Sequence, residues 1–167
     1  MSQPTAFHQL GRFIFLFQHI EAALTELLVL LARADDETTR ILVNELEYGK
    51  RVTTTDVMFA RFADLGPESA KTAKVDFHKI MLELTELGKR RNDIIHSKYS
   101  RWINVEGVDG LIRRNSKLRT SKGKALRELD EEELLPEAFE ADCNRMSLSL
   151  MQLEDFRMKI IAWLYPE

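Results

Sequence analysis

The stretch FHKIMLELTELGKRRNDIIHSKY, residues 77–99, decides the fold because its apolar residues recur on one helical face. At about 100° per residue, that face comprises Ala73, Phe77, Ile80, Met81, Leu84, Leu87, Gly88 and Ile95. Arg91 lies at the centre of the face, and Asn92, His96 and Tyr99 follow along one edge. Polar side chains on the buried face of a helix are costly unless they form hydrogen bonds, so they indicate either an internal partner or a function. We therefore predict a long helix over residues 67–99 with a functional site at its carboxyl end.

Further helices are predicted on both sides of this segment. Residues 4–34 carry apolar side chains at three- and four-residue spacing, the mark of an amphipathic helix. Shorter helices are expected over residues 38–47 and 54–63. The pair Gly66-Pro67 predicts a break after the second of these helices. A last helix is expected over 136–164. The predicted fold is mainly α, an antiparallel bundle of four to five helices with a small β-hairpin and loop insertion before the last helix.

The insertion, residues 100–127, departs from the helical pattern. Residues 101–105 alternate in polarity, Gly107 to Gly110 predicts a turn, and apolar content resumes at Leu111, which together favour a β-hairpin. Residues 115–124 are rich in small residues and cations, and we expect a mobile loop there.

Length and composition indicate one domain, residues 1–167, with 44% apolar and 31% charged residues. The single cysteine, Cys143, excludes an internal disulfide framework and fits a reducing cytosol. The first helix is hydrophobic enough to suggest a membrane span, but polar residues such as Gln18 and Glu26 interrupt it and no charged signal-type start is present. We expect a buried helix in a cytoplasmic protein without a membrane partner.

Charge is unevenly distributed along the chain. The net charge is −3, yet residues 89–127 hold 12 Lys or Arg against three acidic residues, a local charge of +9. Such a basic lobe would attract a polyanion through phosphate contacts. The alternative interpretation is a solvated segment that balances an acidic bundle. The residues predicted to contact RNA are Lys98, Arg101, Arg113, Arg114, Lys117, Arg119, Lys122 and Lys124.

Arg91-Asn92 followed by His96, near the end of a long helix, resembles the motif of the HEPN superfamily of small helical-bundle proteins. The resemblance implies a metal-independent endoribonuclease, often a toxin or defence protein. It also implies a homodimer in which the motifs of two protomers meet at the interface. An antitoxin protein is a further partner that this resemblance suggests.

The three motif residues have complementary chemistry for RNA cleavage. An imidazole titrates near neutrality, so His96 can act as general base or acid toward a 2′-hydroxyl. The fixed fork of Arg91 suits the scissile phosphate, and Asn92 would position the nucleotide or His96. We expect Tyr99 and Glu21 to support the site, Glu21 by pairing with Arg91. Alternatively, Arg91 pairs with a core carboxylate and His96 caps a helix end.

Other functions are less well supported by the sequence. His19, His78 and His96 raise a metal site as an alternative, but His78 and His96 lie about 27 Å apart along one helix, so neither a metal nor another cofactor is predicted. Tyr99 and Trp102 could stack on unpaired bases or pack against the bundle. The alternative function is a non-catalytic, dimeric module of the same fold that binds a nucleotide or a partner.

Overall fold

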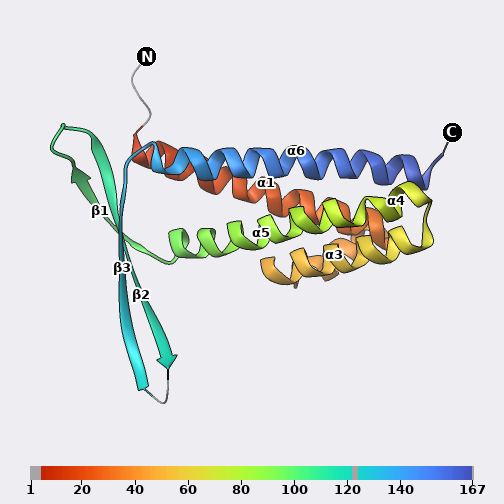
Figure 1. The fold of residues 1–167 in the computed structure, drawn as a ribbon, viewed down its shortest axis with the longest axis horizontal. Coiled ribbons are helices and arrows are strands. Elements are labelled where there is room, and N and C mark those ends of the chain that lie inside the picture. Colours follow the sequence, from red (N-terminus) through yellow and green to blue (C-terminus); the bar gives the residue numbers. More distant parts are fainter. Residues whose placement is uncertain (1–4, 122–123, 167) are drawn as a thin grey trace. The chain divides into compact units, whose positions relative to one another are not determined.

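The protein is mainly helical, with a small three-stranded antiparallel sheet (Figure 1). The computed structural model describes residues 5–121 and 124–166, leaving out the side chains of 117–126. In these residues the elements are α1 (Ala6–Ala32), α2 (Asp36–Asn44), α3 (Tyr48–Leu65), α4 (Glu68–Thr72), α5 (Lys74–Ile95), β1 (Lys98–Ile103), β2 (Asp109–Ser121), β3 (Lys124–Leu134) and α6 (Ala138–Leu164).

Most predicted helices are present, with shifted ends. α1 and α6 confirm the two long terminal helices, and α2 begins where Asp35 accepts a 2.8 Å hydrogen bond from the backbone N–H of Thr38. Such a cap satisfies an N–H that has no partner within the helix. α3 is longer than predicted, because it begins at Tyr48, includes Gly49 in its first turn and continues to Leu65.

The predicted motif helix over 67–99 is wrong at both ends. It is interrupted at Ala73, which separates α4 from α5, and α5 stops at Ile95. His96 therefore lies just beyond the helix, and Tyr99 belongs to β1. The helical period places residues on a face only while the helix continues, so the predicted alignment of Tyr99 with Arg91 fails.

The chain divides into two compact units, and α1, α5 and α6 each contribute a part to both. Unit 2 comprises residues 16–88 and 145–167, and its core is aromatic. Phe59 of α3 stacks on Phe77 of α5 with ring centroids 4.0 Å apart, and Phe156 of α6 meets both rings edge-on. Aromatic pairs favour the edge-on geometry because the edge of one ring is positive and the face of the other negative.

Gly88 is required in unit 2 because an aromatic ring occupies the space of its missing side chain. A Cβ at Gly88 would collide with the ring of Tyr48, whose hydroxyl donates a 2.7 Å hydrogen bond to the carbonyl of Leu84. Tyr48 thus links α3 to α5 directly.

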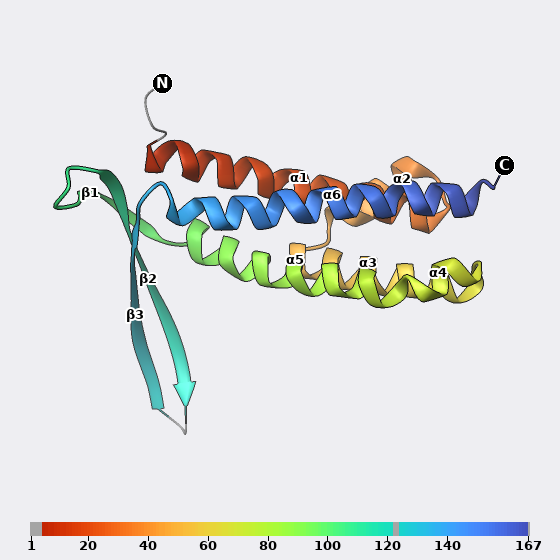
Figure 2. The same cartoon turned by 45° about the horizontal axis from the view of Figure 1, so that its top comes forward.

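Unit 1 comprises residues 1–15 and 89–144 and contains the sheet, in the order β1-β2-β3. β1 pairs only with the first half of β2, from Asp109 to Arg114, whereas β3 pairs with β2 as far as Ser121. Beyond Arg114 the sheet is therefore a two-stranded ribbon, visible in both views as the paired arrows β2 and β3 (Figures 1 and 2).

The predicted hairpin is confirmed, but the insertion is larger and more regular than expected. The sheet spans Lys98 to Leu134 rather than residues 100–127. The mobile loop predicted over 115–124 is wrong for residues 115–121 and Lys124, which belong to strands. Small and polar residues are compatible with a strand when a partner strand satisfies their backbone groups, and β3 supplies that partner.

In the described part of the chain, α1 has the length and apolar composition of a membrane-spanning helix, a profile that core helices of soluble proteins share. Phe13, Ile20 and Leu24 of this helix are fully buried in the protein.

Candidate functional site

The three residues of the HEPN-like motif lie together where α5 ends. Arg91 is half-buried, whereas Asn92 and His96 are exposed. The Arg91 Nη1 donates a 3.1 Å hydrogen bond to the Oδ1 of Asn92, and the His96 backbone N–H donates to the Asn92 carbonyl at 3.1 Å. The imidazole is therefore accessible to a ligand, and Asn92 is bonded both to the Arg91 guanidinium and to the backbone of His96.

Side chains from the sheet cap the carboxyl end of α5. The Tyr99 hydroxyl donates a 2.8 Å hydrogen bond to the carbonyl of Ile94, and the Arg113 Nη1 donates to the carbonyl of Asp93 at 3.3 Å. The same Nη1 donates to the Oγ of Ser97 at 3.2 Å, and the Ser97 hydroxyl donates to the Asp93 carbonyl. Carbonyls at a helix end lack partners within the helix. These contacts satisfy them and fix the turn that carries His96.

Tyr99 thus supports the candidate site, though from a strand and not from the motif helix. Burial raises the pKa of its hydroxyl, and the nearby Arg113 acts in the opposite direction. A phenol with a raised pKa remains protonated at neutral pH. It can therefore keep donating to the helix end.

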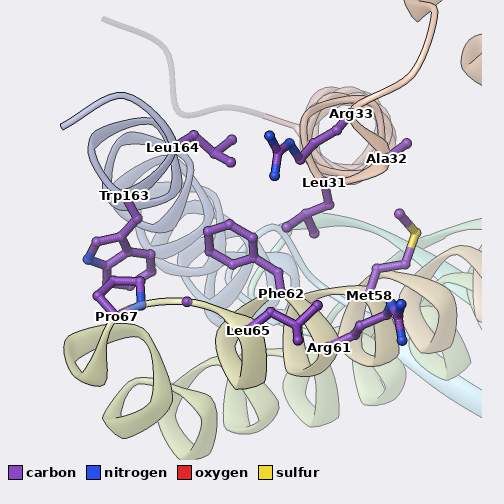
Figure 3. Close-up of a pocket in the computed structure, with 11 residues that line it drawn as sticks. Leu31, Ala32, Arg33, Met58, Arg61, Phe62, Leu65, Pro67, Trp163 and Leu164 are labelled. Carbon is purple, nitrogen blue, oxygen red and sulfur yellow. The ribbon is translucent and has the colours of Figure 1, made fainter.

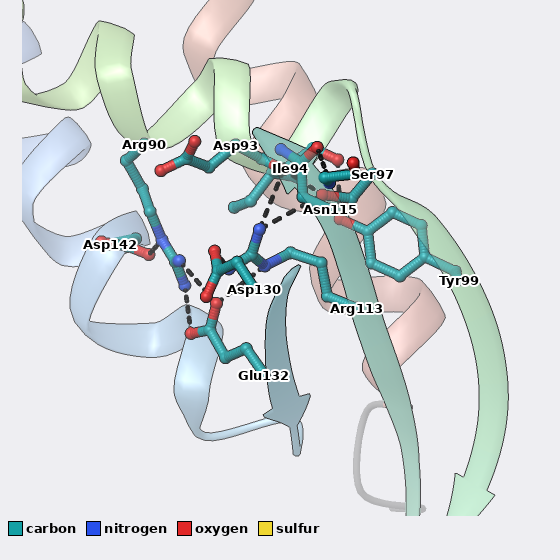
Figure 4. A network of polar contacts seen from close by, with 11 residues as sticks. Arg90, Asp93, Ile94, Ser97, Tyr99, Arg113, Asn115, Asp130, Glu132 and Asp142 are labelled. Atoms are coloured by element: carbon teal, nitrogen blue, oxygen red, sulfur yellow. Dashed lines mark hydrogen bonds and ion pairs between the residues drawn. The ribbon is translucent and has the colours of Figure 1, made fainter. Parts of the chain in front are cut away.

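A network of two arginines and three carboxylates lies beside this turn (Figure 4). Arg90 binds Glu132 through two hydrogen bonds of 2.8 and 2.9 Å, and its Nε donates to Asp142 at 2.8 Å. Arg113 donates to Glu132 at 2.8 Å and to Asp130 at 2.7 Å. Glu132 therefore bridges the two guanidinium groups and joins α5 to β2 and β3.

The network shifts the pKa values of its members in the directions expected for ion pairs. The hydrogen bond from Arg90 lowers the pKa of Glu132, although burial acts to raise it. The hydrogen bond to Glu132 raises the pKa of Arg90 despite burial. Burial acts to lower the pKa of Arg113, but the bonds to Asp130 and Glu132 outweigh it and the pKa is raised. All three groups are charged at neutral pH.

A cation paired with carboxylates, the role considered for Arg91, is found at its neighbour Arg90. Sequence reasoning missed Arg90 because it lies about 100° around α5 from Arg91, on the side away from Asn92 and His96. It missed Glu132 and Asp142 because they lie in distant segments of the chain. One signal was available: residues 128–133 contain five acidic residues directly after the basic segment. Opposite charges on adjacent antiparallel strands favour pairing.

The basic lobe is consequently less basic than the sequence segment suggested. Over residues 89–134 there are 12 basic and 8 acidic residues, a net charge of +4. Arg101 pairs with Asp109, and Arg114 pairs with Glu131, in both cases at the surface.

Arg113 is withdrawn from the predicted RNA-binding residues, because its side chain is only 3% exposed and its donors are engaged within the protein. Lys98 is exposed at the start of β1. The side chains of Lys117, Arg119, Lys122 and Lys124 lie outside the described residues, so their predicted contact with RNA stays a prediction.

The remaining sequence candidates are dispersed. Glu21 belongs to unit 2 and Arg91 to unit 1, so their pairing stays a prediction. His78, considered as a metal ligand, hydrogen-bonds through Nδ1 to the Oδ2 of Asp56 at 2.6 Å. Within residues 5–121 and 124–166, no group of three or more His, Cys, Asp or Glu side chains is arranged to hold a metal ion.

Comparisons with protein-family models, with curated proteins and with solved structures found no match to this chain. Its function is therefore inferred from its residues and their arrangement.

Proposed function

We propose that this protein is a metal-independent endoribonuclease of the HEPN type, in which Arg91, Asn92 and His96 act on RNA. The observation that carries the proposal is the accessibility of Asn92 and His96, with Arg91 bonded to Asn92 beside them. Arg90 and Arg113 are engaged in the ion network beside the motif. These two arginines would hold the turn that carries the motif, and Arg91 would act within it.

The chemistry requires only groups that the motif supplies. The 2′-oxygen of a ribose forms a bond to the adjacent phosphorus while the bond from phosphorus to the 5′-oxygen of the next nucleotide breaks. His96 moves the proton that leaves the 2′-hydroxyl or reaches the 5′-oxygen. Arg91 stabilises the charge on the non-bridging oxygens. The products are a 2′,3′-cyclic phosphate and a free 5′-hydroxyl.

The proposal includes the fold and assembly that the resemblance implies. The helices would form an antiparallel bundle of four to five helices, which the aromatic contacts among α3, α5 and α6 support. Two protomers would bring their motifs together in a homodimer. A cytoplasmic location and an antitoxin partner also belong to this proposal.

The proposal is tested with purified protein and single-stranded RNA in the presence of EDTA. We expect cleavage to continue at the rate seen with added Mg²⁺, because no step needs a metal. Loss of cleavage in EDTA that Mg²⁺ restores would overturn the metal-independent mechanism.

Replacing the four cations Lys117, Arg119, Lys122 and Lys124 with Gln is expected to weaken RNA binding without changing sequence preference, because phosphate contacts are largely sequence-blind. For single-stranded RNA, the slope of log affinity against log salt should fall by about 3 if each cation contacts one phosphate. Fluorescence anisotropy at several salt concentrations measures this slope. An unchanged slope would place RNA away from the hairpin.

We expect a homodimer that depends on exposed apolar residues of α1. Phe7 and Phe15 are 59% and 60% exposed and lie eight residues apart, on one face of the helix. Symmetric homodimers commonly bury such an exposed apolar face between identical subunits. Light scattering should give twice 19.4 kDa for the wild type and a monomer for the Phe7→Ser, Phe15→Ser variant.

Val105→Ser is the matched control for this experiment, since Val105 is fully exposed in the turn between β1 and β2, and that variant should remain dimeric. A wild-type monomer at micromolar concentration would contradict the dimer.

The alternative function, a non-catalytic module that binds a nucleotide or partner, is favoured by the same exposed apolar residues. A dimer that binds RNA or nucleotide but cleaves no RNA in either metal condition would support this alternative over the nuclease.

A further inference from the structure

A pocket of about 410 Å³ lies within unit 2 (Figure 3). None of its lining residues belongs to the HEPN-like motif. This volume falls within the range of about 300–1,000 Å³ typical of small-molecule sites. The end of α1, the last turns of α3, the Gly66-Pro67 turn and the end of α6 form its wall. Phe62, Leu31 and Leu164 supply much of its apolar surface.

The polar side chains of this pocket are all hydrogen-bond donors. The lining includes Arg33, Arg61 and the indole of Trp163, and it includes no carboxylate, carboxamide or hydroxyl side chain. Within the described part of the chain, neither guanidinium forms an ion pair or a side-chain hydrogen bond. Elsewhere in unit 2, Arg40 pairs with Glu26 and Arg157 with Glu154. Among the described residues, the two pocket arginines thus leave a positive charge without a protein counterion.

The backbone at Arg33 is a second, independent observation. Arg33 follows the last residue of α1 with φ 51°, and it is the only non-glycine residue with positive φ in residues 5–121 and 124–166. Glycine is the usual residue at such a helix end, because a Cβ there approaches the carbonyl oxygen. Backbone strain at a binding position is a recognised sign of function. The side chain extends from this position toward Leu164 (Figure 3).

A purely structural role explains only one of the two arginines. A cation after a helix end interacts favourably with the helix dipole, which would account for Arg33. Arg61, however, lies within α3 and not after a helix end. The shared feature of the two residues is the pocket.

We propose that this pocket binds a small amphipathic anion, a carboxylate or phosphate group attached to an aliphatic body. Guanidinium groups bind both kinds of oxyanion, and the apolar wall would cover the body of the ligand. A nucleotide fits less well, because the lining has no acceptor or hydroxyl side chain to recognise a base or sugar. The site is independent of the proposed nuclease function.

Binding is measured through Trp163, which becomes the only tryptophan in a Trp102→Phe background, since the chain holds two. We expect decanoate and decyl phosphate to change its fluorescence saturably, below their micelle-forming concentrations. Decanol and decyltrimethylammonium should bind at least about tenfold more weakly, because each lacks the charge-assisted hydrogen bonds.

Tighter binding of one anion identifies the preferred headgroup. Equal binding of decanol, or saturable binding by none of the four, would overturn the proposal.

Arg33→Gly separates binding from folding. Glycine relieves the backbone strain, so the melting temperature should stay the same or rise by about 2–4 °C. Affinity for the anion should nevertheless fall about tenfold, and Arg61→Gln should lower it similarly. Arg157→Gln is the matched control, because it removes an arginine of unit 2 outside the pocket. Unchanged affinity in both pocket variants, or an equal loss in Arg157→Gln, would contradict the site.

Discussion

Replacing His96 with Ala is expected to reduce RNA cleavage by about 10²- to 10⁴-fold, the contribution of a positioned general acid or base. Because the imidazole is exposed and lies beyond the last residue of α5, the substitution should leave the melting temperature nearly unchanged. RNA binding should also persist, since the proposal assigns the phosphate contacts to other residues. The loss therefore belongs to the chemical step, which single-turnover cleavage with saturating enzyme measures.

His78→Ala is the matched control for this substitution. His78 is also an exposed histidine of α5, and its ring is bonded to Asp56. We expect this variant to cleave RNA at the wild-type rate. Equal cleavage by the wild type and His96→Ala would remove His96 from the mechanism.

Replacing Arg113 with Met is expected to lower the free energy of unfolding by about 3–5 kcal/mol, the range for removing one partner of a buried ion pair. The side chain of Arg113 is only 3% exposed, whereas those of its partners Glu132 and Asp130 are 32% and 42% exposed, so the lost pairing chiefly leaves the protein without the buried guanidinium. Its loss leaves Glu132 with one guanidinium partner and removes a donor from the Asp93 carbonyl. Denaturant titration followed by circular dichroism measures the change.

Arg114→Met provides the control on the neighbouring position of β2. The Arg114 side chain is 54% exposed and pairs with Glu131 at the surface, and surface pairs contribute only about 0–1 kcal/mol. In a double-mutant cycle, Arg113→Met with Glu132→Gln should cost less than the sum of the single changes. Equal losses in Arg113→Met and Arg114→Met, or strict additivity in the cycle, would contradict the network.

The same network predicts how stability depends on pH. Glu132 has a lowered pKa in the folded protein, chiefly through its hydrogen bond with Arg90. A carboxyl group of this kind stabilises the fold above its unfolded pKa of about 4.3, and the contribution is lost as pH falls through the lower folded pKa. Glu132→Gln should therefore show a smaller loss of stability on acidification than the wild type. The lowered pKa of Glu132 and the loss of stability on acidification both result from its hydrogen bond with Arg90.

The helices were predictable because their apolar residues follow a regular period. The face of α5 from Phe77 to Leu87 is buried as predicted, since local periodicity and burial agree there. The end of α5 was not predictable in the same way, because contacts from Tyr99 and Arg113 on the sheet stop the helix. Helix ends that depend on partners far along the chain leave little local signal.

Pairing across strands explains the other differences. The segment after Arg114 appeared to be a loop because its small polar residues lack an apolar alternation, yet β3 supplies backbone partners for it. Arg90 and Arg113 are structural cations because each pairs with carboxylates that lie 17–52 residues away in the sequence. The motif residues, by contrast, lie within six consecutive positions, so the sequence alone brought them together.

Analysis of the RNA ends made in EDTA by the wild type and by His96→Ala tests the proposed function most directly. Mass spectrometry should find 2′,3′-cyclic phosphate and 5′-hydroxyl ends with the wild type, and neither product above background with His96→Ala. Ends bearing 5′-phosphate and 3′-hydroxyl groups would contradict the mechanism, because attack by the 2′-hydroxyl cannot produce them. Intact RNA after incubation with the wild-type protein would contradict the nuclease itself.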